Sequence, residues 1–231
     1  MPDRAQGPVV AIVVAAGSST RMDGMDKVFA TLAGRPLIAW TLAAFKKCDD
    51  VEGIVIVAAP DRIDRMRAFV HEWRIAKVDA VVPGGATRQD SVRAGIEAAP
   101  TAAIVAVHDA ARPLVTAQII SAGVVLAREA GAAVCAVRSR DTVKQADDAA
   151  VITSTLDRDS VWLAQTPQVF DRELLLEAHR RAEATATDDA ALVEALGHEV
   201  RLYEGYAWNI KVTTPEDLIA AEAVLHDRLS R

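Results

Sequence analysis

Cysteine and long apolar runs are scarce in this 231-residue sequence. The two cysteines, Cys48 and Cys135, lack C-x-x-C spacing, which argues against a disulfide framework or a zinc site and predicts two buried thiols. No apolar run approaches the ~20 residues that cross a bilayer, and the first residues lack the apolar core of a signal peptide. We therefore expect a cytoplasmic protein without a membrane partner.

Aromatic residues and excess positive charge are also scarce. Aromatic residues make up 4% of the chain, and its formal net charge is −6. Because nucleic-acid-binding domains concentrate lysine and arginine on one face, this balance argues against DNA or RNA as a partner. It favours a small-molecule partner.

Apolar residues, most of them aliphatic, are abundant: they make up 51% of the chain, which is enough for a large core. Short β-branched runs alternate with amphipathic stretches, which predicts a single α/β domain over residues 1–231. It is a Rossmann-like, mostly parallel twisted sheet with helices on both faces, which binds ligands at the carboxyl ends of its strands. The expected strands are 9–15, 53–59, 78–83, 103–108, 132–137, 200–203 and 208–212. The expected helices are 36–47, 61–73, 90–98, 116–130, 172–182, 188–196 and one that begins at Pro215 and ends the chain, with no second enzyme domain after it.

Residues 138–170 break this alternation. They contain TVKQADDAAVITSTLD, two β-type runs around a polar turn, which predicts a projecting β-hairpin arm. Long excursions from a compact domain are usually functional or interfacial.

The segment VVAAGSSTRMDGMDK, residues 13–27, begins in the first expected strand and continues into a loop. Its small residues let a phosphate approach the backbone amides, and two basic side chains add positive charge. It matches neither the Walker loop nor the dinucleotide fingerprint. The alternative is an ordinary turn with two solvated basic side chains. The candidate residues are Ala15, Ala16, Gly17, Arg21 and Lys27.

Three later segments also lie at the ends of expected strands. In PGGATRQDSV, residues 83–92, two glycines permit a tight turn and Asp90 or Ser91 can cap the next helix. In VHDAARP, Asp109 ends a strand where a carboxylate can bind Mg²⁺, or it is a turn residue paired with Arg112. In NIKVTTPEDL, Lys211 faces either the phosphate site or solvent.

These strings, in this order, resemble the 2-C-methyl-D-erythritol 4-phosphate cytidylyltransferases from about residue 9 to about residue 225. The corresponding motifs are A-A-G-x-[GS]-x-R-M at 15–22, a lysine at 27, G-G-x-x-R-x-D-S-V at 84–92, V-H-D-A-A-R-P at 107–113 and N-I-K-[VI]-T-x-P-E-D-L at 209–218. Further matches are D-T-[VM]-K at 141–144, D-R-x-x-[VL]-W at 157–162, Q-T-P-Q-x-F at 165–170 and T-D-[DE]-A at 187–190.

The resemblance implies transfer of a cytidylyl group from CTP to methylerythritol phosphate with release of pyrophosphate, in non-mevalonate isoprenoid synthesis. It implies Mg²⁺ bound by Asp109, and a homodimer whose arms, residues 138–170, complete shared active sites. The implied catalytic residues are Arg21, Lys27 and Lys211. The implied nucleotide-binding residues are Ala15, Ala16, Gly17, Gly85, Ser91 and Asp109. The implied acceptor-binding residues are Asp109, Thr142, Arg158 and Thr166.

The chain departs from the family pattern at three positions. Asp26 stands where proline usually precedes the loop lysine, Ala86 replaces an acidic residue, and Val14 replaces a proline. No departure removes a charged catalytic group. Two alternatives are a cytidylyltransferase for another polyol phosphate, such as ribitol phosphate, and a nucleotide-binding sensor without catalysis.

Overall fold

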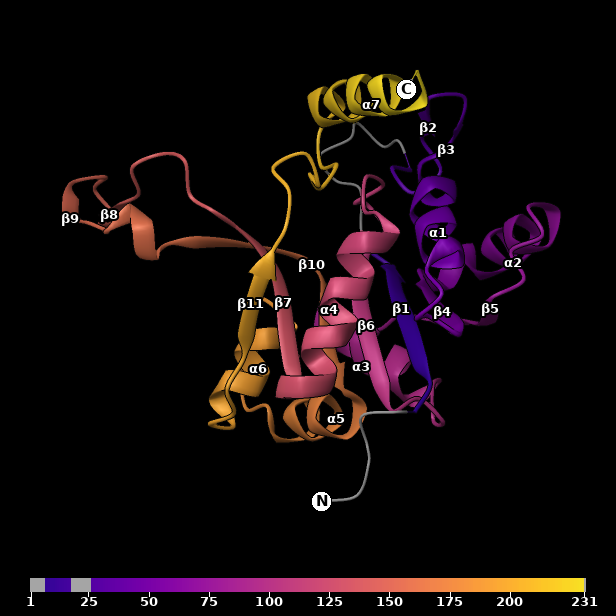
Figure 1. The fold of residues 1–231 in the computed structure, drawn as a ribbon, viewed down its shortest axis with the longest axis horizontal. Coiled ribbons are helices and arrows are strands. Elements are labelled where there is room, and N and C mark those ends of the chain that lie inside the picture. Colours follow the sequence, from indigo (N-terminus) through magenta and orange to yellow (C-terminus); the bar gives the residue numbers. More distant parts are fainter. Residues whose placement is uncertain (1–6, 18–25, 231) are drawn as a thin grey trace.

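The computed structural model describes residues 7–17 and 26–230. Its centre is a seven-stranded sheet in the order β11-β7-β10-β6-β1-β4-β5 (Figure 1). All neighbouring strands run parallel except β10, which is antiparallel to both β6 and β7. The strands are β1 Val9–Ala15, β4 Gly53–Ala58, β5 Val78–Pro83, β6 Ile104–Asp109, β7 Ala132–Arg138, β10 Trp162–Asp171 and β11 Arg201–Glu204.

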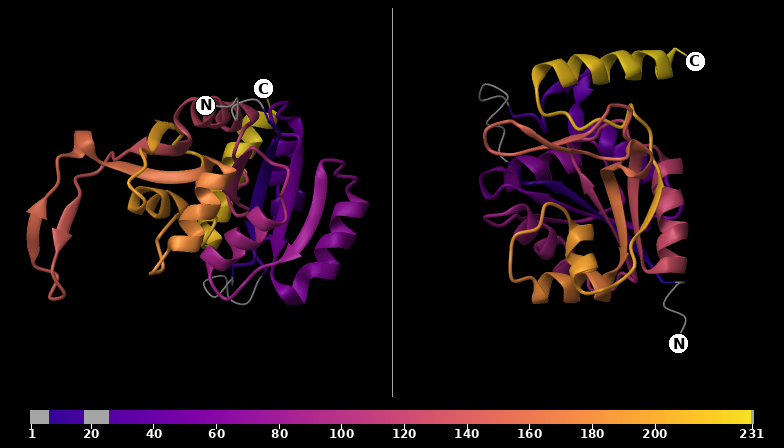
Figure 2. Two further views of the ribbon diagram at one scale, coloured as in Figure 1. Left: turned by 90° about the horizontal axis from the view of Figure 1, so that it is seen from below. Right: turned by 90° about the vertical axis from the view of Figure 1, so that its left-hand side faces the viewer.

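Helices cover both faces of this sheet, as the sequence predicts (Figure 2). One face packs against α1 Leu37–Lys47, α2 Ile63–Glu72 and α4 Ala117–Ala130, and the other against α3 Arg88–Glu97, α5 Arg172–Arg181 and α6 Asp189–Ala195. Buried β-branched residues of the strands face both ways, because a parallel sheet between two helical layers has no solvent-facing side. The mostly parallel α/β prediction is confirmed.

A smaller apolar cluster holds the last helix, α7 Pro215–Leu229, over the carboxyl edge of the sheet. There Leu32 and Leu37 pack with Leu114 and Val212 beneath Leu225. The short strands β2 Thr31–Leu32 and β3 Arg35–Pro36 form a hairpin beside it. The described residues include two 3₁₀ turns, η2 Pro60–Arg62 and η3 Arg158–Ser160.

The arm is shorter than the predicted 138–170. Its hairpin consists of β8 Lys144–Ala146 and β9 Ile152–Thr155, which project from the body (Figure 1). From Trp162 onward the chain returns to the sheet as β10, where Val169 and Phe170 are fully buried. The prediction is wrong there because the strand carries buried polar residues whose partners lie elsewhere: Gln168 donates to Asp188 and accepts from the Ala190 amide.

The predicted strand 208–212 is also wrong. Within the described chain this segment joins no strand ladder: it crosses the carboxyl edge of the sheet, and its Val212 amide bonds to Ala111 O in the loop after β6, 2.8 Å away. The apolar and polar residues of this segment do not face two sides of a sheet. Asn209 and Val212 are both fully buried where the segment crosses the sheet edge, and Lys211 lines a cavity there. Among the described residues, no helix is long and apolar enough to cross a membrane.

Candidate active site

The site lies at the carboxyl edge of the sheet, where the strand order reverses. The chain proceeds from β1 to β4 and β5 on one side, then returns to β6 on the other side of β1. Loops at such a switch point diverge and leave a crevice. Here the loops after β1, β5 and β6 enclose a cavity of about 430 Å³. Its lining includes the predicted Ala15, Ala16, Gly17, Lys27, Gly85, Ser91, Asp109 and Lys211.

Two glycines make one wall of the cavity possible. A Cβ on Gly84 would lie 2.4 Å from the Ala16 Cβ, and a Cβ on Gly85 would lie 2.3 Å from the Asp90 Cβ. The Gly85 amide donates to Ser91 Oγ at 3.2 Å. A larger residue at Gly84 would push this wall away from Ala16, which follows β1, and one at Gly85 would displace the start of α3.

The predicted cap of the following helix is wrong in detail. Helix α3 begins at Arg88, and Thr87 is its N-cap, accepting from the Asp90 amide at 3.0 Å. Asp90 accepts in return from the Thr87 amide, which completes a capping box. Ser91 is left to bond the glycine turn.

Asp109 is the most strongly paired carboxylate of the cavity. Its Oδ2 lies 2.9 Å from Lys211 Nζ and 3.7 Å from Arg112 Nε, and its Oδ1 lies 3.7 Å from Arg88 Nε. Burial by itself would raise the pKa of Asp109, but Lys211 and Arg88 outweigh it and hold the pKa at about 2. Of the alternatives from the sequence, the pairing of Asp109 with Arg112 is present and Lys211 faces the site; Mg²⁺ binding by Asp109 stays a prediction.

A buried chain of hydrogen bonds fixes the backbone at Asp109. His108 is fully buried, and burial lowers its pKa to about 4, so the imidazole is neutral near pH 7. Since Arg112 O can only accept, His108 Nε2 donates to it, at 3.2 Å, and Nδ1 accepts from the Thr166 hydroxyl at 3.1 Å. The Thr166 oxygen then accepts from the Asp109 amide at 3.1 Å.

Arg88 was not predicted as a site residue. Its Nη1 lies 2.7 Å from Asp189 Oδ2, and the other oxygen of Asp189 lies 3.1 Å from His179 Nε2. Asp189 is 1% exposed. The helix α6 thus holds an arginine against Asp109 from the side opposite Lys211. The motif G-G-x-x-R-x-D-S-V specifies an arginine at 88 and T-D-[DE]-A an acid at 189, but no local pattern pairs these residues, which lie 101 residues apart.

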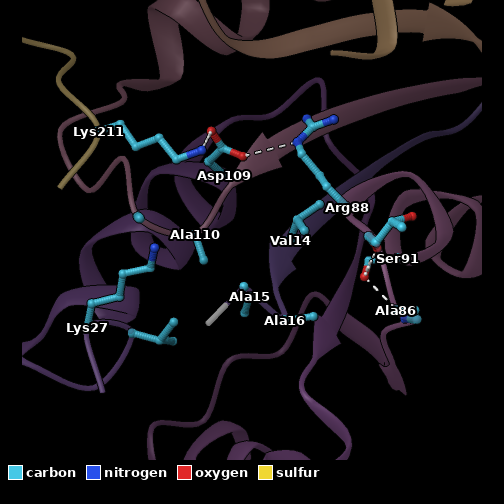
Figure 3. Close-up of a pocket in the computed structure, with 15 residues that line it drawn as sticks. Val14, Ala15, Ala16, Lys27, Ala86, Arg88, Ser91, Asp109, Ala110 and Lys211 are labelled. Carbon is cyan, nitrogen blue, oxygen red and sulfur yellow. Dashed lines mark hydrogen bonds and ion pairs between the residues drawn. The ribbon is translucent and has the colours of Figure 1, made fainter. Parts of the chain in front are cut away.

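Figure 3 shows how the side chains are arranged around the cavity. Lys27 and Lys211 lie on one side, and Ser91 and Ala86 lie on the other, with Ala15 and Ala16 between them. The cavity therefore has two lysines on one side and small neutral residues on the other. That division suits a ligand with a phosphate end and a flat uncharged end.

Comparison with known proteins identifies the family of the chain. The model of the 2-C-methyl-D-erythritol 4-phosphate cytidylyltransferase family matches residues 9–227. The chain belongs to this family. It is 43% identical to the cytidylyltransferase of Dehalococcoides mccartyi strain CBDB1, over 94% of this chain and 96% of that protein. It is 49% identical to a bifunctional IspD/IspF enzyme of Desulforudis audaxviator, covering 94% of this chain but only 56% of that longer protein.

Solved structures of the family have the same fold. The enzyme from Anaerococcus prevotii aligns with a TM-score of 0.85 at 30% identity, over 95% of this chain and 96% of that one. The enzyme from Thermus thermophilus aligns with a TM-score of 0.76 at 36% identity, over 96% of this chain and 100% of that one.

The acceptor-binding residues that the family pattern implies are not all brought to the cavity. Thr142 and Arg158 are exposed on the arm and do not line it. Arg158 donates to Arg140 O at 3.5 Å, within its own arm. Thr166 is not on the arm: it is 4% exposed in β10, bonded to His108 and Asp109. Arg21 lies outside the described residues.

A divalent metal would depend on Asp109. Among the residues that the structure describes, no group of three or more His, Cys, Asp or Glu side chains converges as a metal site. Mg²⁺ commonly takes one or two carboxylates and completes its octahedral shell with waters and substrate phosphates. A single ionised carboxylate beside a cavity lined by two lysines fits that mode of binding.

Proposed function

We propose that the chain transfers the cytidylyl group of CTP to 2-C-methyl-D-erythritol 4-phosphate and releases pyrophosphate, as its family does in non-mevalonate isoprenoid synthesis. One observation carries the proposal: Lys27, Lys211 and Asp109 meet the glycine wall of residues 84–91 in a single cavity. Two lysines from separate segments of the chain line this cavity, where they can neutralise the negative charge of a nucleoside triphosphate.

The glycine wall is the proposed cytosine subsite. We assign Gly85, Ser91 and the backbone of Ala15 to this subsite, and Ala16 and Gly17, which also line the cavity, to nucleotide binding beside it. A purine ring needs more width than a pyrimidine ring. Because side chains at Gly84 and Gly85 are excluded, the width of this subsite is set by backbone and resists small adjustments.

The proposed reaction is an in-line displacement at phosphorus. An oxygen of the methylerythritol phosphate attacks the α-phosphorus of CTP, one P–O bond forms, and the bond to the β-phosphate oxygen breaks as pyrophosphate leaves. Such transfers depend on positioning and on neutralising charge rather than on a side-chain nucleophile. We assign this neutralisation to Lys27, Lys211 and Arg21.

We assign Mg²⁺ to Asp109, where it would neutralise the phosphates of CTP. The chain contributes the ionised state of this carboxylate, which the low pKa secures, and its direction, which Thr166 and His108 fix through the backbone. Arg88 is held by Asp189 and in turn holds the orientation of the Asp109 carboxylate in the cavity.

For the acceptor we propose a homodimer in which the arm of one subunit reaches the cavity of the other. Thr142 and Arg158 are exposed and lie outside the cavity of their own chain, which supports this arrangement. We also assign Thr166, which lies in β10 and not on the arm, to binding of the acceptor. The buried free thiols Cys48 and Cys135 agree with work in the reducing cytoplasm.

The test is pyrophosphate release with Mg²⁺, comparing methylerythritol phosphate with ribitol phosphate as acceptor and CTP with UTP, ATP and GTP. We expect rapid release only with CTP and methylerythritol phosphate. Faster release with ribitol phosphate would assign the other polyol, and CTP binding without turnover over either acceptor would indicate a sensor. Equal use of ATP, or full activity in excess chelator, would contradict the assignment.

A further inference from the structure

Asp26 immediately precedes Lys27, and its carboxylate pairs with two arginines. Its Oδ1 lies 3.0 Å from Arg62 Nη1, and its Oδ2 lies 3.3 Å from Arg65 Nη1. The Asp26 side chain is 16% exposed, against 59% for Arg65. We name these three residues, Asp26, Arg62 and Arg65, the Asp26 anchor. It ties the turn that carries Lys27 to η2 and α2.

The backbone after Asp26 is fixed at the same place. The Val28 amide donates to Asp26 Oδ1 at 3.2 Å, and the Phe29 amide donates to Asp26 O at 3.1 Å. On the other side, Val28 O accepts from the Ile38 amide at 3.0 Å. Lys27 therefore lies between Val28, which is bonded to α1, and Asp26, which is bonded to η2 and α2.

An aromatic contact strengthens the link to α2. The guanidinium carbon of Arg65 lies 4.0 Å from the centre of the Phe29 ring, and Phe29 packs edge-on against Phe69 at 5.7 Å. Arg65 thus contacts the turn twice, through the carboxylate of Asp26 and through the ring of Phe29. Such cation–π contacts are stabilising when part of the cation is shielded from water.

We propose that the Asp26 anchor positions Lys27 for the reaction, a role that rests on the proposed catalytic function of Lys27. Two physical effects follow from the contacts. The anchor fixes the backbone from which the Lys27 side chain enters the cavity. It also neutralises with two arginines a carboxylate that would otherwise compete with phosphate for the neighbouring ammonium group.

The test measures kcat and KM for CTP in Asp26→Ala, in Lys27→Ala and in the double variant. We expect Asp26→Ala to lower kcat about tenfold and to change KM for CTP by less than about twofold, since small displacements of a reacting group affect the rate most. In the Lys27→Ala background, Asp26→Ala should lower kcat by less than about twofold, because residues that act through one another are not additive.

Two further variants separate positioning from folding. Asp64→Ala is the matched control: Asp64 lies on the same helix as Arg65, its side chain is fully exposed, and its contact with Arg67 is 3.9 Å long. We expect it to leave kcat and the melting temperature unchanged. Arg62→Ala removes one partner and leaves the Asp26 carboxylate, and should lower kcat severalfold. If Asp26→Ala does not fold, Arg62→Ala replaces it, and its effect on kcat is compared between the wild-type and Lys27→Ala backgrounds.

An unchanged kcat in Asp26→Ala, or an equal tenfold loss in both backgrounds, overturns the anchor. Either result can occur while Lys27→Ala is strongly impaired, which leaves the proposed function standing. If Lys27→Ala itself is nearly as active as the wild type, the proposed function of Lys27 fails, and the anchor fails with it.

Discussion

The two parts of the proposed active site differ in how firmly the chain holds them. At the carboxyl edge of the sheet, Asp109 is bonded or paired to four other residues and is almost fully buried. On the arm, Thr142 and Arg158 are exposed, and the hydrogen bond of Arg158 to Arg140 O is long, at 3.5 Å. The proposed nucleotide half is organised within one chain, whereas the proposed acceptor half is displayed on a surface.

The cause lies in the topology. Parallel strands converge at one edge, so the loops that follow them hold one another in place across the switch point. The arm carries only the two-stranded sheet of β8 and β9, and a two-stranded hairpin alone is marginally stable in water. Figure 2 shows the arm standing clear of both helical layers. The position of the arm during the reaction therefore depends on a contact with another molecule, which in the proposed homodimer is the second subunit.

The largest expected effect is in the organised half. Lys27→Ala should lower kcat by about 10²–10³-fold with little change in KM for CTP, because comparable charge-stabilising donors are worth about 3–4 kcal/mol in the transition state. Steady-state kinetics of the variant measure this, with Arg67→Ala on the exposed side of α2 as the matched control. A rate within a few-fold of wild type would leave Lys27 an ordinary surface lysine.

The next effect concerns acid stability of the same half. Burial holds the folded-state pKa of His108 at about 4, against an ordinary value of 6.5, so the unfolded chain takes up this proton first as pH falls. The free energy of unfolding should therefore decrease from pH 6.5 to pH 4, by about 3 kcal/mol from this residue. Asp109, whose pKa is about 2, adds a further loss below pH 4.

Urea unfolding across pH 7.5 to 4 in the presence of a chelator measures the slope. His108→Gln should show a shallower decrease than the wild type, although it is less stable at neutral pH. The exposed His71 provides the control, since His71→Gln should keep the wild-type slope. Equal slopes for wild type and His108→Gln would show that the imidazole is not buried neutral.

A smaller effect is expected on the arm. Arg158→Ala should raise KM for methylerythritol phosphate by about tenfold, the worth of one charge-assisted hydrogen bond, and leave KM for CTP unchanged. Lys144→Ala, which removes an exposed basic residue of β8 bonded to Thr155 across the hairpin, is the control. An equal rise in KM for CTP would show that Arg158 also contributes to nucleotide binding, which would contradict the division into a nucleotide half and an acceptor half.

Much of the organised half could be predicted from the sequence. Continuous β-branched runs such as 9–15 and 53–58 specify buried parallel strands, and in such a sheet the residues after each strand meet at one edge. That is why Lys27, Gly85 and Asp109, widely separated in the chain, share a cavity; Lys211 joins them from the segment that crosses this edge.

The rest depends on long-range pairing, which local patterns do not encode. Arg62 and Arg65 lie 36 and 39 residues from Asp26, so the sequence shows only an unexpected acid beside a lysine. Segment 208–212 alternates like a strand, yet it crosses the sheet edge and joins no ladder of the described strands. Thr166 resembles part of the arm in sequence because β10 carries its polar residues inside, bonded to partners on β6, α6 and the last crossing segment.

The central claim, that the two halves of each site come from different subunits, is tested most directly by mixing Lys27→Ala and Arg158→Ala chains. The assay uses methylerythritol phosphate well below its KM, where each homodimer should keep at most about a tenth of the wild-type rate. A heterodimer has one site with both defects and one with neither, so isolated heterodimers should regain up to about half of the wild-type activity. If both homodimers are impaired and the heterodimers regain nothing, the arm serves its own subunit and the claim is wrong.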